Sequence, residues 1–281
     1  GDDANLFSLI SERMELVAKA HAQKRQFIER LLAFGDGGPL ALLSMDCEGS
    51  PYLRLERATH LIGVVGLNEL VQAHRGLQLH EGEKAIGFGL DVLGHIQKVA
   101  ARLGRKHNLR FILEQSPAES TAYRFARLDL KYHSPLSGRF VRGDIARGEL
   151  YYTNSTQFNI AAKADPFPRI ASEGLFHPVI EGNAVSSVWL GESRPPAETL
   201  ARFVKRMFRE TTGSQIVFSP EFTVCPTCRQ TTRGIRPSCS DCGSTRVEGI
   251  SRVGGYLTHT SRLNRGKLAE LRDTHRTESL R

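Results

Sequence analysis

Four cysteines constrain this chain more than any other feature of its sequence. Cys225, Cys228, Cys239 and Cys242 form the pattern C-x2-C-x10-C-x2-C. Each CxxC pair can present two thiolates, and the connection lets both pairs meet around one tetrahedral ion, the geometry of closed Zn²⁺ sites. Because four thiolates leave no open position, the spacing predicts a structural zinc. A redox dithiol usually has a single CxxC pair, and iron–sulfur clusters usually have other spacings.

The residues around these cysteines refine the prediction. A glycine or small polar residue after the second cysteine favours the turn of each pair; Gly243 fits this rule and Arg229 departs from it. The fifth cysteine, Cys47, stands alone, and we expect it to be a small buried apolar residue. Cysteines gathered in this way do not form the dispersed disulfide framework of a secreted protein.

Positive charge is concentrated near the C-terminal end. The net charge is +8, and residues 225–281 hold 11 Lys and Arg against 5 Asp and Glu. Such a segment is typical of a nucleic-acid-binding surface and also of a solvated terminal helix. The four-cysteine segment lacks interleaved aromatic residues for base stacking. A basic zinc-ribbon nucleic-acid-binding protein therefore remains the alternative interpretation.

Composition predicts a globular cytoplasmic chain. Hydrophobic residues make up 40% of the sequence, enough for a core. No apolar run approaches the roughly 20 residues that a membrane span needs. Residues 1–17 have neither the basic nor the apolar region of a signal peptide. We therefore expect no membrane partner.

Hydrophobic periodicity predicts alternating helices and strands before the cysteines. One long helix or a helical pair is expected at 3–34. Further helices are expected at 83–106, 117–131, 165–175 and 196–212, and strands at 109–115, 151–162, 184–190 and 214–219. Residues 60–74 change from an apolar β-branched run to a helical pattern, with Asn68 as the expected N-cap. This alternation favours parallel pairing in an α/β layer or barrel.

A glycine pair follows the cysteines in RVGGYLTHTSRLNRGKLAELRD, residues 252–273. Taken alone, the pair is typical of a turn. The pattern R-V-x-G-Y-L, then R-x-N-x-G-K-x-x-E-L-R-D, resembles the C-terminus of the large subunit of anaerobic (class III) ribonucleotide reductases. Further matches occur in the order of that family: THLIGVVGLNELV, SPAESTAYRFARLDLKY, YYTNST, GLFHPV and VWLGE. The resemblance covers about residues 55–275.

The resemblance implies an α/β fold in two parts. Residues 1–220 would be the C-terminal half of the ten-stranded α/β barrel of glycyl radical enzymes. Residues 221–281 would form a zinc ribbon, a glycyl radical loop and a C-terminal helix.

The resemblance also implies radical chemistry, with the radical at Gly255. A Cα radical delocalises into both peptide groups only where the carbon can flatten, and glycine has no Cβ to oppose this. A radical-SAM activating enzyme would take the Cα hydrogen of Gly255. The glycyl radical would then generate a thiyl radical that attacks ribonucleoside triphosphates, yielding deoxyribonucleoside triphosphates for DNA synthesis. Formate or a thioredoxin-like system would be the reductant, and a homodimer is expected.

Other site residues follow from the same matches. Glu119, in PAES, would be a carboxylate near the ribose, with a helix-dipole role as the alternative. Asn68 and Asn154 would contact substrate, with capping as the equal alternative. His60, His177 and His259 are not assigned a role, since a lone histidine is more often structural.

The chain departs from the family pattern upstream. The thiyl cysteine and the ATP/dNTP effector module of the family would lie N-terminal to the matched region, and Cys47 is too close to that region to be the thiyl cysteine. We therefore expect a fragment, or one piece of a split enzyme, that is inactive alone. A non-catalytic remnant of the reductase is a further alternative.

Overall fold

The computed structural model describes residues 1–162, 164–253 and 256–275; of these, the side chains of Glu119, Val253 and His275 are not described. The chain divides into two compact units. Unit 1 is Gly1–Ile62 with Leu90–Glu114, and unit 2 is Gly63–Gly89 with Gln115–Arg281. A domain boundary at residue 220 stays a prediction. Among the described residues, none of the helices combines the length and apolar character that crossing a membrane requires.

Unit 1 is built on two long helices, which confirm the helices expected at 3–34 and 83–106. Its elements are α1 (Asp3–Leu32), α2 (Ala41–Ser44), β1 (Asp46–Cys47), β2 (Ser50–Pro51), β3 (Thr59–Val64, up to residue 62), α4 (Glu83–His107, from residue 90 onward) and β4 (Arg110–Gln115, up to residue 114). Asp2 caps α1 by accepting a hydrogen bond from the N–H of Asn5. A contact of 2.8 Å between Ser11 and His95 joins α1 to α4.

The expectation that Cys47 is buried is wrong. Cys47 is exposed. It lies in β1, which pairs only with β2, and the register places Cys47 opposite Ser50. A two-stranded hairpin of this length has no second layer to cover its side chains, so the thiol faces solvent.

In unit 2, a parallel strand pair confirms the βαβ pattern expected from residue 184 onward. β7 (Ser186–Gly191) and β8 (Ile216–Pro220) pair in parallel, and α7 (Ala197–Glu210) connects them. Together with α6 (Pro166–Glu173), these elements enclose a core of Ile170, Val188, Leu190 and Met207. Alternation along β7 turns Ser187 and Trp189 to the opposite face.

A second layer of unit 2 joins two helices to a hairpin. β5 (Arg142–Asp144) and β6 (Glu149–Tyr151) pair antiparallel and contact α5 (Glu119–His133) and α8 (Arg265–His275). The strand expected at 151–162 is wrong beyond Tyr151. Residues 152–162 are irregular because their carbonyls serve a helix start: Thr153 accepts from Gly66 N–H and Ser155 from Leu67 N–H.

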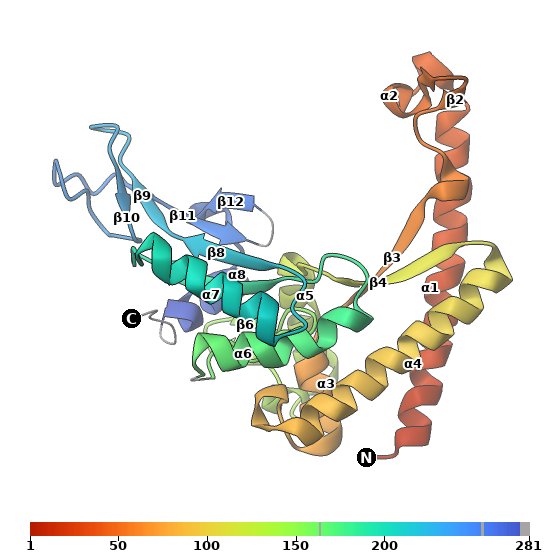
Figure 1. Cartoon of the computed structure of the whole chain (residues 1–281), viewed down its shortest axis with the longest axis horizontal. Helices are drawn as coiled ribbons and strands as arrows, with labels where there is room; N and C mark the ends of the chain where they lie inside the picture. Colours follow the sequence, from red (N-terminus) through yellow and green to blue (C-terminus); the bar gives the residue numbers. More distant parts are fainter. Residues whose placement is uncertain (163, 254–255, 276–281) are drawn as a thin grey trace. The chain divides into compact units, whose positions relative to one another are not determined.

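A four-stranded antiparallel sheet contains the cysteine segment. Its order is β10 (Thr231–Arg233), β9 (Phe222–Val224), β11 (Glu248–Val253) and β12 (Tyr256–His259) (Figure 1). The other sheets formed by the described residues have two strands each. The ten-stranded barrel therefore stays a prediction.

Candidate functional site

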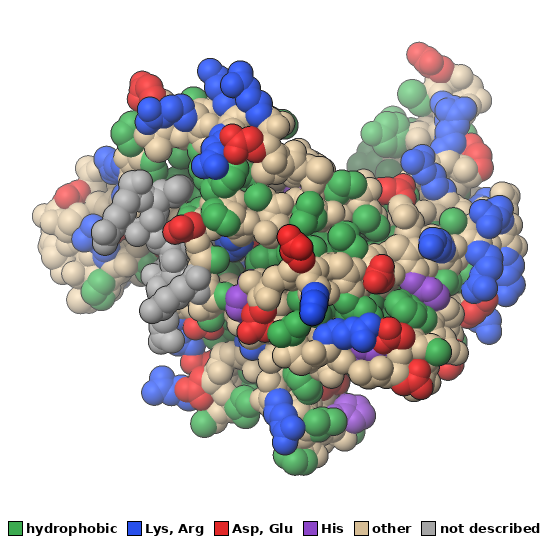
Figure 2. Space-filling model, turned by 60° about the horizontal axis from the view of Figure 1, so that its bottom comes forward, with side chains coloured by type: hydrophobic (Ala, Val, Ile, Leu, Met, Phe, Trp, Pro, Cys, Tyr) green, Lys and Arg blue, Asp and Glu red, His purple; other side chains and the backbone are tan. Residues whose placement is uncertain are grey.

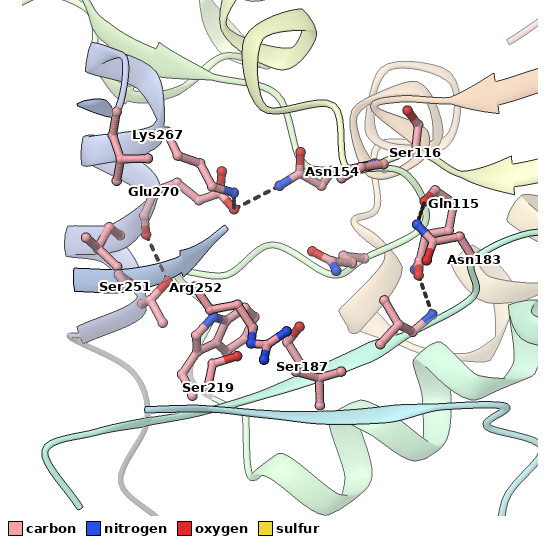
Figure 3. A pocket seen from close by; sticks show the side chains of 18 of the residues that line it. Gln115, Ser116, Asn154, Asn183, Ser187, Ser219, Ser251, Arg252, Lys267 and Glu270 are labelled. Carbon is pink, nitrogen blue, oxygen red and sulfur yellow. Dashed lines mark hydrogen bonds and ion pairs between the residues drawn. The ribbon is translucent and has the colours of Figure 1, made fainter. Parts of the chain in front are cut away.

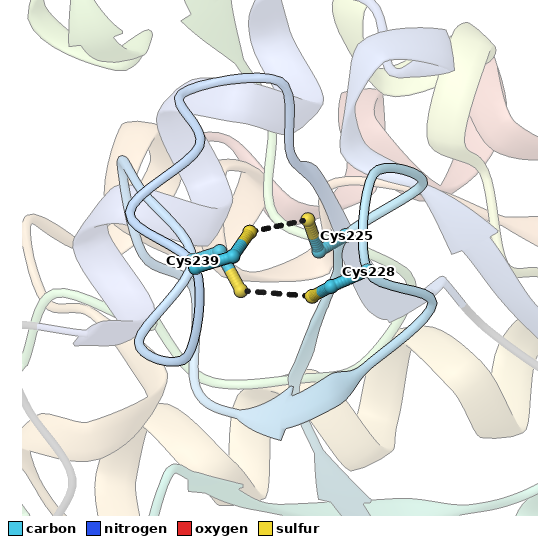
Figure 4. A group of neighbouring side chains, drawn as sticks. Cys225, Cys228 and Cys239 are labelled. Carbon is cyan, nitrogen blue, oxygen red and sulfur yellow. Dashed lines mark hydrogen bonds between the residues drawn. The ribbon is translucent and has the colours of Figure 1, made fainter.

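The four cysteine thiols of the ribbon converge on one point (Figure 4). Their Sγ atoms all lie within 4.8 Å of one another. Cys225 and Cys242 are 3.7 Å apart, and Cys228 and Cys239 are 3.5 Å apart. A tetrahedron with Zn–S bonds of about 2.3 Å has edges of about 3.8 Å. The donor set and its spacing therefore fit a tetrahedral zinc ion.

Each cysteine pair turns through a residue in the left-handed backbone region. Gly243 has φ +71° and Arg229 has φ +61°. The turns are closed by hydrogen bonds from Cys225 N–H to Gln230 O and from Cys239 N–H to Ser244 O, both 2.9 Å. The first turn thus holds an arginine where glycine would fit without steric cost.

Thiols this close together oppose one another's ionisation. Hydrogen bonds from the backbone N–H groups of Cys228 and Thr227 lower the pKa of the Cys225 thiol to about 6. The N–H of Gln230 favours the thiolate of Cys228, but burial and the neighbouring thiols together raise the pKa of Cys228 to about 12. One thiolate is therefore ready to bind a cation, and a bound dication would favour ionisation of the others.

One sheet connects the cysteine cluster to the glycine pair. β9 ends one residue before Cys225 and pairs with β11, which in turn pairs with β12. Val253, the last residue of β11, is opposite Tyr256, the first residue of β12. The predicted radical position, Gly255, falls between these two strands in sequence and lies outside the described residues.

The same strand β11 forms one wall of a cavity of about 290 Å³ (Figure 3). Other walls come from β7, β8, α8 and the loop 152–162. Its polar lining consists of Gln115, Ser116, Asn154, Gln157, Asn183, Ser187, Gln215, Ser219, Ser251, Arg252, Lys267, Glu270 and Thr274. The cavity thus offers amide, hydroxyl and charged groups to a polar ligand.

A buried charged cluster lies at the α8 side of this cavity (Figure 3). Glu270 Oε1 accepts hydrogen bonds from Lys267 Nζ at 2.9 Å and from Asn154 Nδ2 at 2.8 Å. The Lys267 and Glu270 side chains are only 12% and 9% exposed, so the ion pair is largely desolvated. Arg252, Lys267 and Glu270 are the ionisable groups among the described residues that line the cavity. They can orient a ligand that carries both hydroxyl and anionic groups.

Glu69 holds the loop that carries Asn154. The Glu69 carboxylate accepts a hydrogen bond from Thr153 N–H at 3.3 Å and forms an ion pair with Arg142 at 3.2 Å. Because both partners are largely buried, the pair fixes the loop conformation and with it the position of Asn154.

The structure places Asn68 differently from the prediction. The helix α3 (Leu67–Arg75) has Gly66 as its N-cap, so the expected capping by Asn68 is wrong. Gly66 adopts φ +76°, and its N–H donates a hydrogen bond to the carbonyl oxygen of Thr153. The start of the helix is therefore held by the backbone of the loop and not by a capping side chain. Asn68 is fully buried and accepts a hydrogen bond from Leu79 N–H. Asn68 does not line the cavity, and its contact with substrate stays a prediction.

Glu119 begins α5, but its side chain lies outside the described part of the structure. Ser116 and Pro117, just before it, line the cavity. Its role at the ribose stays a prediction.

The three histidines make structural contacts. His177 accepts a hydrogen bond from Ser214 N–H at 2.9 Å. His60 approaches His21 at 3.3 Å, and burial lowers the pKa of both rings. His259 pairs with Glu248 at 2.6 Å.

Sequence reasoning missed Lys267 and Glu270 as cavity residues. Their i, i+3 spacing in GKLAE places both on one face of a helix, and this signal was present in the sequence. The partner, Asn154, is more than a hundred residues away, so only the fold brings the cluster together.

The sequence and the structure of this chain are similar to those of the same group of known proteins. Residues 1–276 match the family model for anaerobic ribonucleoside-triphosphate reductase. The chain is similar to the enzymes of that name from Escherichia coli (24% identity over 192 residues, 66% of this chain and 26% of the relative) and Haemophilus influenzae (22%, 91% and 37%). The phage T4 enzyme is 25% identical over 69% of this chain and 32% of the relative.

Among solved structures, the chain resembles the anaerobic ribonucleotide reductase from Thermotoga maritima with MES in its active site. The TM-score is 0.72 at 25% identity, covering 94% of this chain and 41% of that one. The chain thus spans between about a quarter and two fifths of the length of these relatives.

Proposed function

The chain belongs to the anaerobic ribonucleoside-triphosphate reductase family, and on this basis we propose that it supplies the radical-bearing segment and part of the active site of such a reductase. The enzyme would reduce ribonucleoside triphosphates to deoxyribonucleoside triphosphates in the cytoplasm. One observation carries the proposal: β11 lines the polar cavity through Ser251 and Arg252 and leads directly to the glycine pair.

Gly255 is the proposed radical position. A radical-SAM activating enzyme removes one hydrogen atom from its Cα, and the flattened carbon spreads the unpaired electron into both flanking peptide groups. Any side chain at this position would oppose the flattening. The strands that precede and follow this segment pair with each other, with Val253 opposite Tyr256.

The four cysteines are proposed as a structural zinc site. A zinc ion there would hold β9 and β11 in register without an open coordination position for catalysis. The ribbon would then hold the radical segment in position, because β11 pairs with β9 of the ribbon and leads to that segment. This role requires no redox chemistry of the cysteines.

The cavity is proposed to hold the substrate. Lys267 and Arg252 would attract its anionic groups, and Asn154 and Glu270 would orient its hydroxyl groups. Glu119, near the start of α5, would serve proton transfer at the leaving hydroxyl. Asn68 would support the loop that carries Asn154, or it would contact the substrate directly.

Further partners follow from the family. The thiyl cysteine, the ATP/dNTP effector module and the reductant, formate or a thioredoxin-like protein, would act together with this chain in a homodimer. The activity of the whole reductase, its substrates and these partners are proposals for this chain.

Electron paramagnetic resonance tests the radical assignment. The chain is combined anaerobically with the activating enzyme, S-adenosylmethionine, a one-electron reductant and the remaining part of the reductase barrel. We expect a glycyl doublet that collapses to a singlet when deuterated glycine is incorporated, because the Cα hydrogen causes the splitting. Gly255→Ala abolishes the signal, and the matched control Gly254→Ala keeps it.

A doublet that persists in Gly255→Ala would refute the assignment. Absence of any radical in the native chain would favour the non-catalytic remnant. On the face drawn in Figure 2, basic, acidic and apolar side chains are interspersed, so this face gives the nucleic-acid-binding alternative no support. Such mixing provides no continuous basic track for a nucleic-acid backbone.

A further inference from the structure

A second cavity, of about 680 Å³, lies between the loop that follows β7 and the zinc ribbon. Three arginines line it: Arg194 from the loop, Arg233 from β10 and Arg236 from the turn beyond β10. Thr231 and Ser240 add hydroxyl groups, and Glu192 is the carboxylate among the described lining residues. We call this cavity the arginine groove.

Arg233 carries a charge that no described carboxylate compensates. Its Nη2 donates to the backbone carbonyl of Ser193 at 2.9 Å, and its guanidinium lies 5.4 Å from the centre of the Phe222 ring. Its Nε is buried and has no acceptor within the described residues. The carbonyl and the aromatic ring orient the guanidinium group but do not neutralise its positive charge. The guanidinium of Arg233 therefore favours a nearby anion.

The other two arginines add to the excess of positive charge. Arg236 forms an ion pair with Glu192 at 3.1 Å, but these side chains are 46% and 70% exposed, so the pair is weak and easily exchanged. Arg194 is exposed and has no partner among the described residues. The groove therefore holds three guanidinium groups against one carboxylate.

The fold holds the groove in shape. Gly234 adopts φ +84°, and a Cβ at this position would lie 2.8 Å from the Cβ of Glu192. The N–H of Gly234 also bonds the carbonyl of Glu221 at 2.9 Å. The loop and the ribbon thus approach as closely as the missing side chain allows, and Arg233 is oriented before any ligand arrives.

We propose that the arginine groove is a binding site for phosphate groups. Guanidinium groups match phosphate oxygens with paired N–H donors, and the hydroxyl groups of Thr231 and Ser240 can donate to a further oxygen. A phosphate carries about two negative charges at neutral pH, which matches the net positive charge of the lining. This site is separate from the proposed substrate cavity and goes beyond the reductase function.

Calorimetric titration of the zinc-loaded chain with inorganic tripolyphosphate at low salt tests the site. This probe has no nucleoside, so recognition of a base or sugar does not contribute. We expect binding that weakens about tenfold or more in Arg194→Ala and in Arg233→Gln, because each removes a charged donor. The control Arg202→Ala loses the same charge from the exposed surface of α7 and keeps the native affinity.

Two results overturn the proposal: no heat of binding at millimolar tripolyphosphate, or an affinity unchanged in Arg194→Ala. The second result is decisive even if Arg233→Gln disturbs the packing on Phe222, because Arg194 is exposed and its removal leaves the fold intact. Zinc content and circular dichroism verify folding of each variant. Parallel titrations with ATP and with a single-stranded oligonucleotide identify whether the phosphate comes from a free nucleotide or from a nucleic-acid backbone.

Discussion

At the scale of single residues, His177 illustrates how burial selects a protonation state. The side chain is 2% exposed, and Nδ1 accepts a hydrogen bond from the N–H of Ser214 at 2.9 Å. Since an accepting nitrogen carries no proton, the ring is neutral in the folded chain. Desolvation lowers the pKa of His177 from 6.5 to about 4. The ring therefore joins the segment after α6 to the start of β8 only while it is uncharged.

Stability should fall in acid because of this group. The unfolded chain binds the proton near pH 6.5 and the folded chain only near pH 4, so the contribution of His177 is complete above pH 6.5 and is lost as pH falls through that window. His177→Gln keeps a neutral acceptor and should show a shallower loss of stability between pH 6.5 and 4. Urea unfolding, followed by fluorescence of the single tryptophan, measures this.

The matched control is His133→Gln, at an exposed position. This variant should retain the native pH dependence. Equal pH dependence in native chain and His177→Gln would show that His177 does not titrate as described.

At the scale of elements, a side-chain hydrogen bond joins α3 to the short 3₁₀ helix at Leu79–Glu81. Oδ1 of Asn68 accepts from Leu79 N–H at 3.0 Å, and both residues are fully buried. The 3₁₀ helix has its own capping box, formed by Gln78 and Glu81. The connection between the two elements thus depends on one amide side chain at a fully buried position.

Asn68→Ala should destabilise the chain by about 1–3 kcal/mol, because it leaves the N–H of Leu79 buried without an acceptor. Chemical denaturation of unit 2, again followed by the tryptophan, gives the value. The control Asn5→Ala, exposed on α1, should change stability by less than about 0.5 kcal/mol. A loss in Asn68→Ala no larger than in the control would contradict this role.

At the scale of the whole molecule, the sheet that contains the ribbon would transmit the effect of a metal bound by the four cysteines. β9 pairs with β11, and β11 supplies Ser251 and Arg252 to the cavity. The ribbon strands are three to six residues long, and the buried residues of their described part are the polar Thr223 and Ser251. Metal binding is therefore expected to be the main source of its folding energy.

Removal of zinc by a chelator should unfold the ribbon sheet and leave unit 1 folded. Hydrogen–deuterium exchange should show lost protection in β9, β10 and β11 and unchanged protection in α1. Metal analysis before chelation should give about one zinc per chain. Retained protection of β11 in a zinc-free chain would show that the ribbon folds without metal.

Sequence alone determined the features that depend on short spacing. The periodicity of residues 3–34 and 83–106 predicted α1 and α4, the cysteine spacing predicted a four-thiol cluster, and the alternation after residue 184 predicted the parallel pair β7 and β8. In each case the interacting residues are close in the chain, or they follow one another at the regular spacing of a helix or a strand. Local geometry then decides the outcome.

Only the tertiary structure decided which distant residues meet. It exposed Cys47, made residues 152–162 irregular, buried Asn68 inside a helix start, and brought Asn154 to Glu270. It also placed Arg194 and Arg233 in the lining of one groove. These outcomes depend on contacts between segments far apart in the chain. Such contacts leave no periodic pattern in the sequence. The sequence therefore determines which chemical groups are present, and the fold determines which of them meet.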